Sequence, residues 1–344
     1  MQVNQRQAHL ELFRFIAAID VVLFHFFGAL GGPDPTWSKL PAVDLFFVVS
    51  GIVLGAKYGE AVLQGRMSWG TFVWHRLRRL YPLLLLSFLL SWVMSLVGLP
   101  EGTVLEARHP QVWGGLLLLP CWHGCDVAFP NNPPTWALFA ELAANAGWFW
   151  CLVLAPALIE VLGAVAGLVF LLAVAFSGYW HIGWSPGVVG VTLGILRALA
   201  FFVLGYSLNK RQIGRHWSTA WVLLAFALVM SFYATGWPPK LHAGLGLLPV
   251  ALAGAFLLAH LFWRRTASQG WATRLSIWLG GLSYPIYLNQ AAAGRLGEYL
   301  MQTHQVPAWF DFLVLPVLVA VAMQALYKIA IAPWLEPWLA SREA

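Results

Sequence analysis

The sequence is poor in charged residues, which make up only 10% of its 344 residues. Soluble domains usually carry about 25% charged residues, so this shortage excludes an ordinary soluble protein. Hydrophobic residues make up 60% of the chain, and many of its 20 tryptophans lie near the ends of apolar segments, as in the aromatic belts of membrane proteins. The composition therefore predicts an integral membrane protein.

Other features are also missing from the sequence. No small-residue cleavage site follows the first apolar run, so we expect this run to stay as an anchor and not to be removed as a signal peptide. No unit repeats, and no segment has the composition of a soluble domain or a low-complexity tail. We expect one integral-membrane domain over residues 1–344, with no appended soluble domain.

The apolar residues gather in about ten segments that approach the ~20 residues needed to cross a bilayer. These segments cover residues 8–31, 42–57, 80–99, 135–158, 161–182, 188–208, 218–236, 244–263, 275–296 and 312–334. They predict an all-α polytopic membrane protein with about ten transmembrane helices.

We interpret the formal net charge of +6 as a sign of how the chain is oriented in the membrane, and not of nucleic-acid binding. The connections after the second, sixth and eighth segments hold most of the basic residues: Lys57, Arg66, Arg76, Arg78, Arg79, Lys210, Arg211, Arg215, Arg264, Arg265 and Arg274. Basic connections face the cytoplasm, so both termini are expected there, and the long connection over residues 100–135 is expected outside.

Cysteine is also scarce, and two of the three cysteines lie in this outer connection as CWHGC. Cys121, His123 and Cys125 offer at most three metal ligands, whereas structural zinc sites have four, so we expect no metal. A disulfide between Cys121 and Cys125 and two free thiols both remain open.

Ionisable residues inside apolar segments indicate function, because each costs roughly 3 kcal/mol at membrane depth and needs a partner. The run LELFRFIAAIDVVLFH carries Glu11, Arg14, Asp20 and His25. Arg14 and His25 are about three helical turns apart and nearly in line. We interpret this face as the wall of a reaction site, with the His25 imidazole as proton acceptor. The alternative is a structural histidine that bonds to a neighbouring helix.

Asp20 lies on another side of the same helix, so an acidic partner for His25 must come from elsewhere. Asp44, at the start of AVDLFFVVSG, is the best candidate, because a carboxylate there could hold the imidazole tautomer. Asp44 as a helix N-cap is the alternative. Ser50, further along this segment, is a candidate substrate contact, with helix packing as its default role.

A basic cluster precedes the third segment in FVWHRLRRLYP. Arg76 and Arg79 are three residues apart and share a helix face, and a guanidinium fork matches phosphate oxygens. With Tyr81 as a further donor, this cluster is a candidate phosphate clamp for a nucleotide-bearing donor such as acyl-CoA. A purely topogenic role is the alternative.

Two more charges lie within predicted spans. Glu141, in NPPTWALFAEL, needs a cationic partner, for which Arg197 and Arg14 are the candidates. Arg197 is a buried cation with the same need. Arg197 and Trp136, which lies five residues before Glu141, are candidate substrate contacts.

These motifs, in this order, resemble the acyltransferase type 3 family of membrane O-acyltransferases. The matching stretches are LELFRFIAAIDVVLFH, AVDLFFVVSG, RLRRLYP, NPPTWALFAEL and LGGLSYPIYL, spread from residue 10 to residue 290. Each stretch is weak alone, but five in register are specific. Three positions depart from the family: Ala137 replaces a hydroxyl residue, Gln290 stands where a histidine is common, and Asp20 is an extra charge.

The resemblance implies an acyl-CoA donor, acetyl-CoA by default, on the cytoplasmic side. It implies a hydroxyl acceptor on an envelope or secreted glycan or a lipid-linked sugar, in a bacterial inner membrane, and leaves a homo-oligomer open. It makes His25 the general base, gives Asp44 and Glu141 supporting catalytic roles, and adds Arg14 to the donor site.

The rival interpretation is a proton-coupled secondary transporter or permease, because intramembrane Arg, Asp, Glu and His also form proton relays. Such transporters tend to show paired repeats and helices broken at the midplane, and the sequence has no such pairing.

Overall fold

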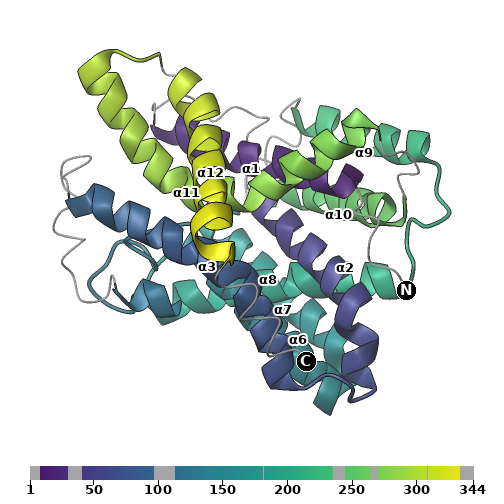
Figure 1. Cartoon of the computed structure of the whole chain (residues 1–344). Helices are drawn as coiled ribbons and strands as arrows, with labels where there is room; N and C mark the ends of the chain where they lie inside the picture. Colours follow the sequence, from purple (N-terminus) through teal and green to yellow (C-terminus); the bar gives the residue numbers. More distant parts are fainter. Residues whose placement is uncertain are drawn as a thin grey trace.

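The computed structural model describes residues 8–29, 41–96, 113–180, 182–234, 245–264, 270–307 and 309–333, and every regular element among them is helical (Figure 1). The long helices are α1 (Ala8–Ala29), α2 (Ala42–Leu63), α3 (Trp69–Leu96), α6 (Thr135–Leu154), α7 (Ile159–Ser177), α8 (Gly187–Lys210), α9 (Thr219–Ala234), α10 (Leu247–Trp263), α11 (Trp271–His304) and α12 (Leu315–Leu326). Short helical turns cover η2 (Gly115–Leu117), η3 (Pro156–Leu158), η4 (Phe310–Val314) and η5 (Tyr327–Ile331).

Each predicted apolar segment overlaps one of these helices, so the all-α fold is confirmed for the described residues. The helices α2, α3, α6, η3 with α7, and α8 are long and apolar enough to cross a membrane. Ten spans and cytoplasmic termini stay predictions. The largest difference is α3, which begins at Trp69 and not near residue 80, because the basic stretch before the apolar run continues the same helix.

Helices α2 and α8 form the centre of the fold, and glycine lets their backbones touch. A Cβ added at Gly51 would lie 1.9 Å from the Phe202 carbonyl oxygen, and one added at Gly205 would lie 2.1 Å from the Val48 oxygen. Small residues at helix contacts allow this close approach in membrane proteins. The contact fixes α8 against α2 and so decides which α8 side chains face the start of α2.

Helices α1, α3 and α11 run in the same direction. Glu11 of α1 packs against Gly280, and Val22 further along α1 packs in one cluster with Ile286. On α3, the Leu80 carbonyl accepts from Tyr284 at 2.8 Å. Positions along α11 therefore give the relative heights of residues on its two neighbours. Figure 1 shows α12 packed beside α11.

The described part of the connection before α6, from residue 113, is held to the loop before α8. Cys121 and Cys125 are joined by a disulfide, which resolves the alternative left open by the sequence. The Cys121 amide donates to the Ala128 carbonyl at 2.7 Å, and the Ala128 amide donates to the Trp184 carbonyl at 3.0 Å. The turn before α6 lies against the second half of α3, where Asn131 and Asn132 donate to Phe88 and Ser87.

Candidate active site

An ion pair between α3 and α6 is the first element of the site. Arg76 Nη2 lies 2.5 Å from Glu141 Oε1, and the Ser50 hydroxyl donates to the same oxygen at 2.7 Å. With its amide oriented to satisfy its neighbours, Asn145 accepts from Arg76 Nε at 3.1 Å. The Arg76 side chain is 6% exposed and that of Glu141 21%. Glu141 therefore pairs with Arg76, and not with Arg197 or Arg14 as expected.

More charges lie beside this pair. Arg14 Nη1 lies 3.2 Å from Glu11 Oε2 within α1, and the Arg14 charge is close enough to interact with those of Arg76, Arg79 and Glu141. The Arg79 side chain is exposed, and among the described residues none forms an ion pair or hydrogen bond with it. The cluster combines three cations with two carboxylates, and Arg79 is its open member. We call these five residues the charge cluster.

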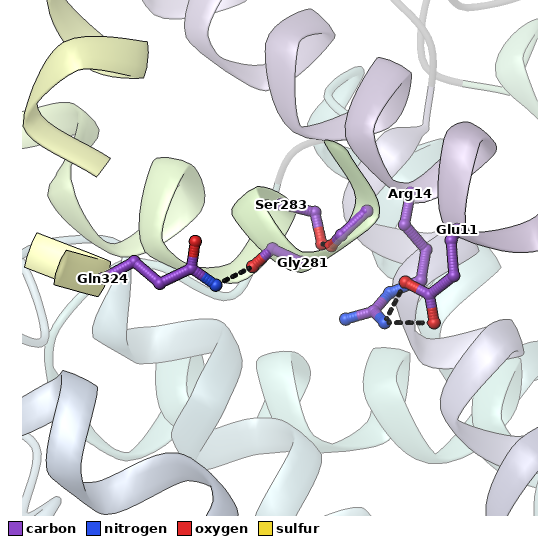
Figure 2. A network of polar contacts seen from close by, with 6 residues as sticks. Glu11, Arg14, Gly281, Ser283 and Gln324 are labelled. Carbon is purple, nitrogen blue, oxygen red and sulfur yellow. Dashed lines mark hydrogen bonds and ion pairs between the residues drawn. The ribbon is translucent and has the colours of Figure 1, made fainter. Parts of the chain in front are cut away.

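The charge cluster is positioned by close contact between α1 and α11. A Cβ at Gly280 would lie 2.4 Å from the Glu11 Cβ, so only glycine permits this spacing. Figure 2 shows Glu11 and Arg14 beside the turn of α11 that carries Gly281 and Ser283. The predicted shared face of the two α3 arginines is only partly realised, because Arg76 is buried while Arg79 is exposed.

A second ion pair joins the start of α2 to α8 and is fully buried. Arg197 donates from Nε to Asp44 Oδ1 at 2.6 Å and from Nη2 to Oδ2 at 2.9 Å, and Trp180 Nε1 donates to Oδ2 at 2.7 Å. The third guanidinium nitrogen, Nη1, donates to the Ile182 carbonyl at 3.0 Å. The side chains of Asp44 and Arg197 are 0% and 1% exposed.

This arrangement corrects the expected pairing of Asp44 with His25. Both carboxylate oxygens of Asp44 accept from Arg197 or Trp180. The prediction that Asp44 pairs with the His25 imidazole is therefore wrong. The His25 side chain is exposed at the far end of α1, with its ring centroid 5.4 Å from that of Phe24. Within the described residues, no hydrogen bond to the imidazole is present.

The remaining candidates lie around the two ion pairs. The Trp136 ring packs over the Arg197 guanidinium, 5.6 Å from ring centroid to Cζ, and beside Phe47. The Tyr81 hydroxyl donates to the Leu116 carbonyl in η2, so its hydroxyl hydrogen is already used. Ser50 contacts Glu141 directly, which makes it part of the first ion pair.

Sequence reasoning missed Asn145 and Trp180. Asn145 follows Glu141 by four residues on the same helix, and this spacing is a signal that could have found it. Trp180 lies between helices, and no local pattern connects it to Asp44.

Comparison with known proteins agrees with the resemblance. No solved structure matches the chain. The chain is 35% identical over 153 residues to "Protein 2 in picA locus" of Rhizobium radiobacter, a match over 40% of this chain and 78% of that protein. The family model described as an acyltransferase domain matches residues 7–327. The protein is therefore a membrane-embedded member of the acyltransferase type 3 family.

Proposed function

We propose that the protein transfers an acyl group, acetyl by default, from cytoplasmic acyl-CoA to a hydroxyl group of an envelope or secreted glycan or a lipid-linked sugar. The observation that carries the proposal is the charge cluster, which places three guanidinium groups and two carboxylates together inside a chain of acyltransferase family membership. The proposed location is a bacterial inner membrane.

The donor site is assigned to the cationic side of the charge cluster. Its formal charge is +1, from three arginines and two glutamates, and a guanidinium binds phosphate oxygens in a planar fork. Arg79, which is exposed, and the neighbouring Arg14 would contact the phosphates of CoA. Arg76, held by Glu141 and Asn145, would position this region.

The general base is assigned to His25, about 16 Å further along α1 than Arg14 at 1.5 Å per residue. An acceptor hydroxyl oxygen attacks the thioester carbonyl carbon while its proton passes to the imidazole. The carbon–sulfur bond then breaks, CoA leaves as its thiolate, and the proton is returned to solvent or to the thiolate. The exposure of the His25 ring supports this role, because a hydroxyl must be able to reach it.

Asp44 and Arg197 are assigned a supporting role away from the reacting atoms. They occupy each other's hydrogen-bonding groups and are closed to a substrate, and they hold α2 against α8. Trp136 belongs to the same packing. Any effect of these residues on transfer would act through the position of the helices.

The proposal is tested by mass spectrometry of envelope glycans and lipids from cells with the gene, without it, and with His25→Ala. The matched control is His9→Ala, which removes an exposed histidine from the other end of the same helix. We expect an added ester with the wild type and with His9→Ala, and its loss with His25→Ala. An ester level that does not depend on the gene would contradict the proposal.

A further inference from the structure

Among described residues that are less than 9% exposed, four amide side chains carry oxygens without a protein partner. They are Asn131 Oδ1, Asn132 Oδ1, Asn289 Oδ1 and Gln290 Oε1. Leaving a buried polar group unpaired costs about 1–3 kcal/mol, so such groups need an explanation. A ligand that supplies hydrogen-bond donors would remove this cost.

The amide nitrogens of three of these side chains donate hydrogen bonds within the protein, which fixes the orientation of their oxygens. Asn131 Nδ2 donates to the Phe88 carbonyl at 3.0 Å, and Asn132 Nδ2 donates to Ser87 Oγ at 2.9 Å. Asn289 Nδ2 donates to the Pro285 carbonyl at 2.8 Å within α11. The three amides are therefore held with their oxygens free of any described protein partner.

The two pairs of amides lie on either side of one α3 residue. Ser87 accepts from Asn132 and donates to the Leu288 carbonyl at 3.0 Å, next to Asn289 on α11. A small cavity lies beside the first pair and is lined by residues that include Phe88, Asn131 and Asn132. The amides thus form one polar layer across α3 between the start of α6 and α11.

The register between α1 and α11 relates the polar layer to His25. On α1, Ala18 and Val22 pack with Ile286 of α11, and His25 follows Val22 by three residues on the same helix face. Because α1 and α11 run in the same direction, the turn of α11 after Ile286 is level with His25. That turn carries Asn289 and Gln290.

We propose that this polar layer binds the hydroxyl groups of a sugar acceptor, with Gln290 as the contact beside His25. Hydroxyl groups donate to amide oxygens, whereas the CoA phosphates are anionic and would be repelled by them. The inference deepens the proposed function, on which it rests, by naming the amides that receive the sugar acceptor. It also gives Gln290, a departure from the family pattern, a role in specificity.

The test replaces the unpaired oxygen and measures saturation by the acceptor. Membranes carrying Gln290→Met receive labelled acetyl-CoA and a dilution series of envelope extract, and the half-saturating concentration of the extract is read. The matched control is Gln302→Met, the same change at an exposed position of α11. Gln290→Glu keeps an accepting oxygen and serves as the conservative variant.

We expect Gln290→Met to raise the half-saturating extract concentration about tenfold, the effect of losing one ligand hydrogen bond. Half-saturation by acetyl-CoA should not change, thermal stability should not fall, and Gln290→Glu should recover part of the loss.

If the wild type transfers label and the extract curve of Gln290→Met equals that of Gln302→Met, the oxygen binds a water or nothing, and this inference is wrong while the proposed function stands. If the wild type transfers no label, the proposed function itself is contradicted. If Gln290→Met does not fold, the same comparison is made with Asn289→Leu.

Discussion

The two buried arginine–carboxylate pairs have similar chemistry but different surroundings. Asp44 and Arg197 are buried, and both Asp44 oxygens and all three Arg197 nitrogens form hydrogen bonds within the protein. Glu141 and Arg76 are partly open and lie among the charges of Arg14, Arg79 and Glu11. A saturated pair can hold helices together but offers nothing to a substrate, whereas a pair inside an open charge cluster can do both. Burial of charge alone therefore does not identify an active site.

The largest effect is expected for Asp44→Asn. Removing one charge leaves the Arg197 guanidinium buried and uncompensated, which costs about 3–5 kcal/mol. We expect loss of folded protein by fluorescence-detected size-exclusion chromatography. The double variant Asp44→Asn with Arg197→Gln, which removes both charges, should recover part of the folded fraction. A well-folded but inactive Asp44→Asn would show that this pair acts in catalysis. It would then not differ in role from the Glu141–Arg76 pair.

A smaller effect on folding, but a large one on activity, is expected for Glu141→Gln. The amide oxygen can still accept from Arg76 and Ser50, so the helices should stay packed. Arg76 loses its counter-charge and its fixed orientation, and misplacement of this kind can cost about 10²-fold in rate. Transfer of label from acetyl-CoA, normalised to folded protein, measures it. A variant that unfolds like Asp44→Asn would make the two pairs equivalent.

The smallest effect is expected for Arg79→Met. The side chain is exposed and no described residue holds it, so stability should change by less than about 0.5 kcal/mol. Loss of a phosphate contact should raise the half-saturating acetyl-CoA concentration about tenfold. Arg66→Met, at an exposed arginine outside the charge cluster, is the control. Equal curves for the two variants would remove Arg79 from the donor site.

The sequence was informative about helices and about which residues carry charge into the membrane. Apolar segments and their basic connections predicted the position of each long helix, because length and hydropathy are local properties. The partners of the charges were not predictable. Arg197 meets Asp44 because glycine contacts at Gly51 and Gly205 bring α8 onto α2, and such a contact between distant segments has no local signal.

The short connection between the first two segments favoured a pairing of His25 with Asp44, and that inference was wrong for the same reason. Closeness in sequence was outweighed by the packing of α8, which takes both oxygens of the carboxylate. The unpaired oxygen of Gln290 was also hidden, since a glutamine in an apolar helix is read by default as a contact between helices.

The central claim is that His25 receives the acceptor proton while acyl-CoA is held on the cytoplasmic side. It is tested most directly by labelled acetyl-CoA, which does not cross membranes, added to inside-out and right-side-out vesicles that carry the wild type, His25→Ala or His9→Ala. The account predicts label in glycan or lipid only in inside-out vesicles, with the wild type and His9→Ala alike, and none with His25→Ala. Transfer by folded His25→Ala at the wild-type rate would contradict it.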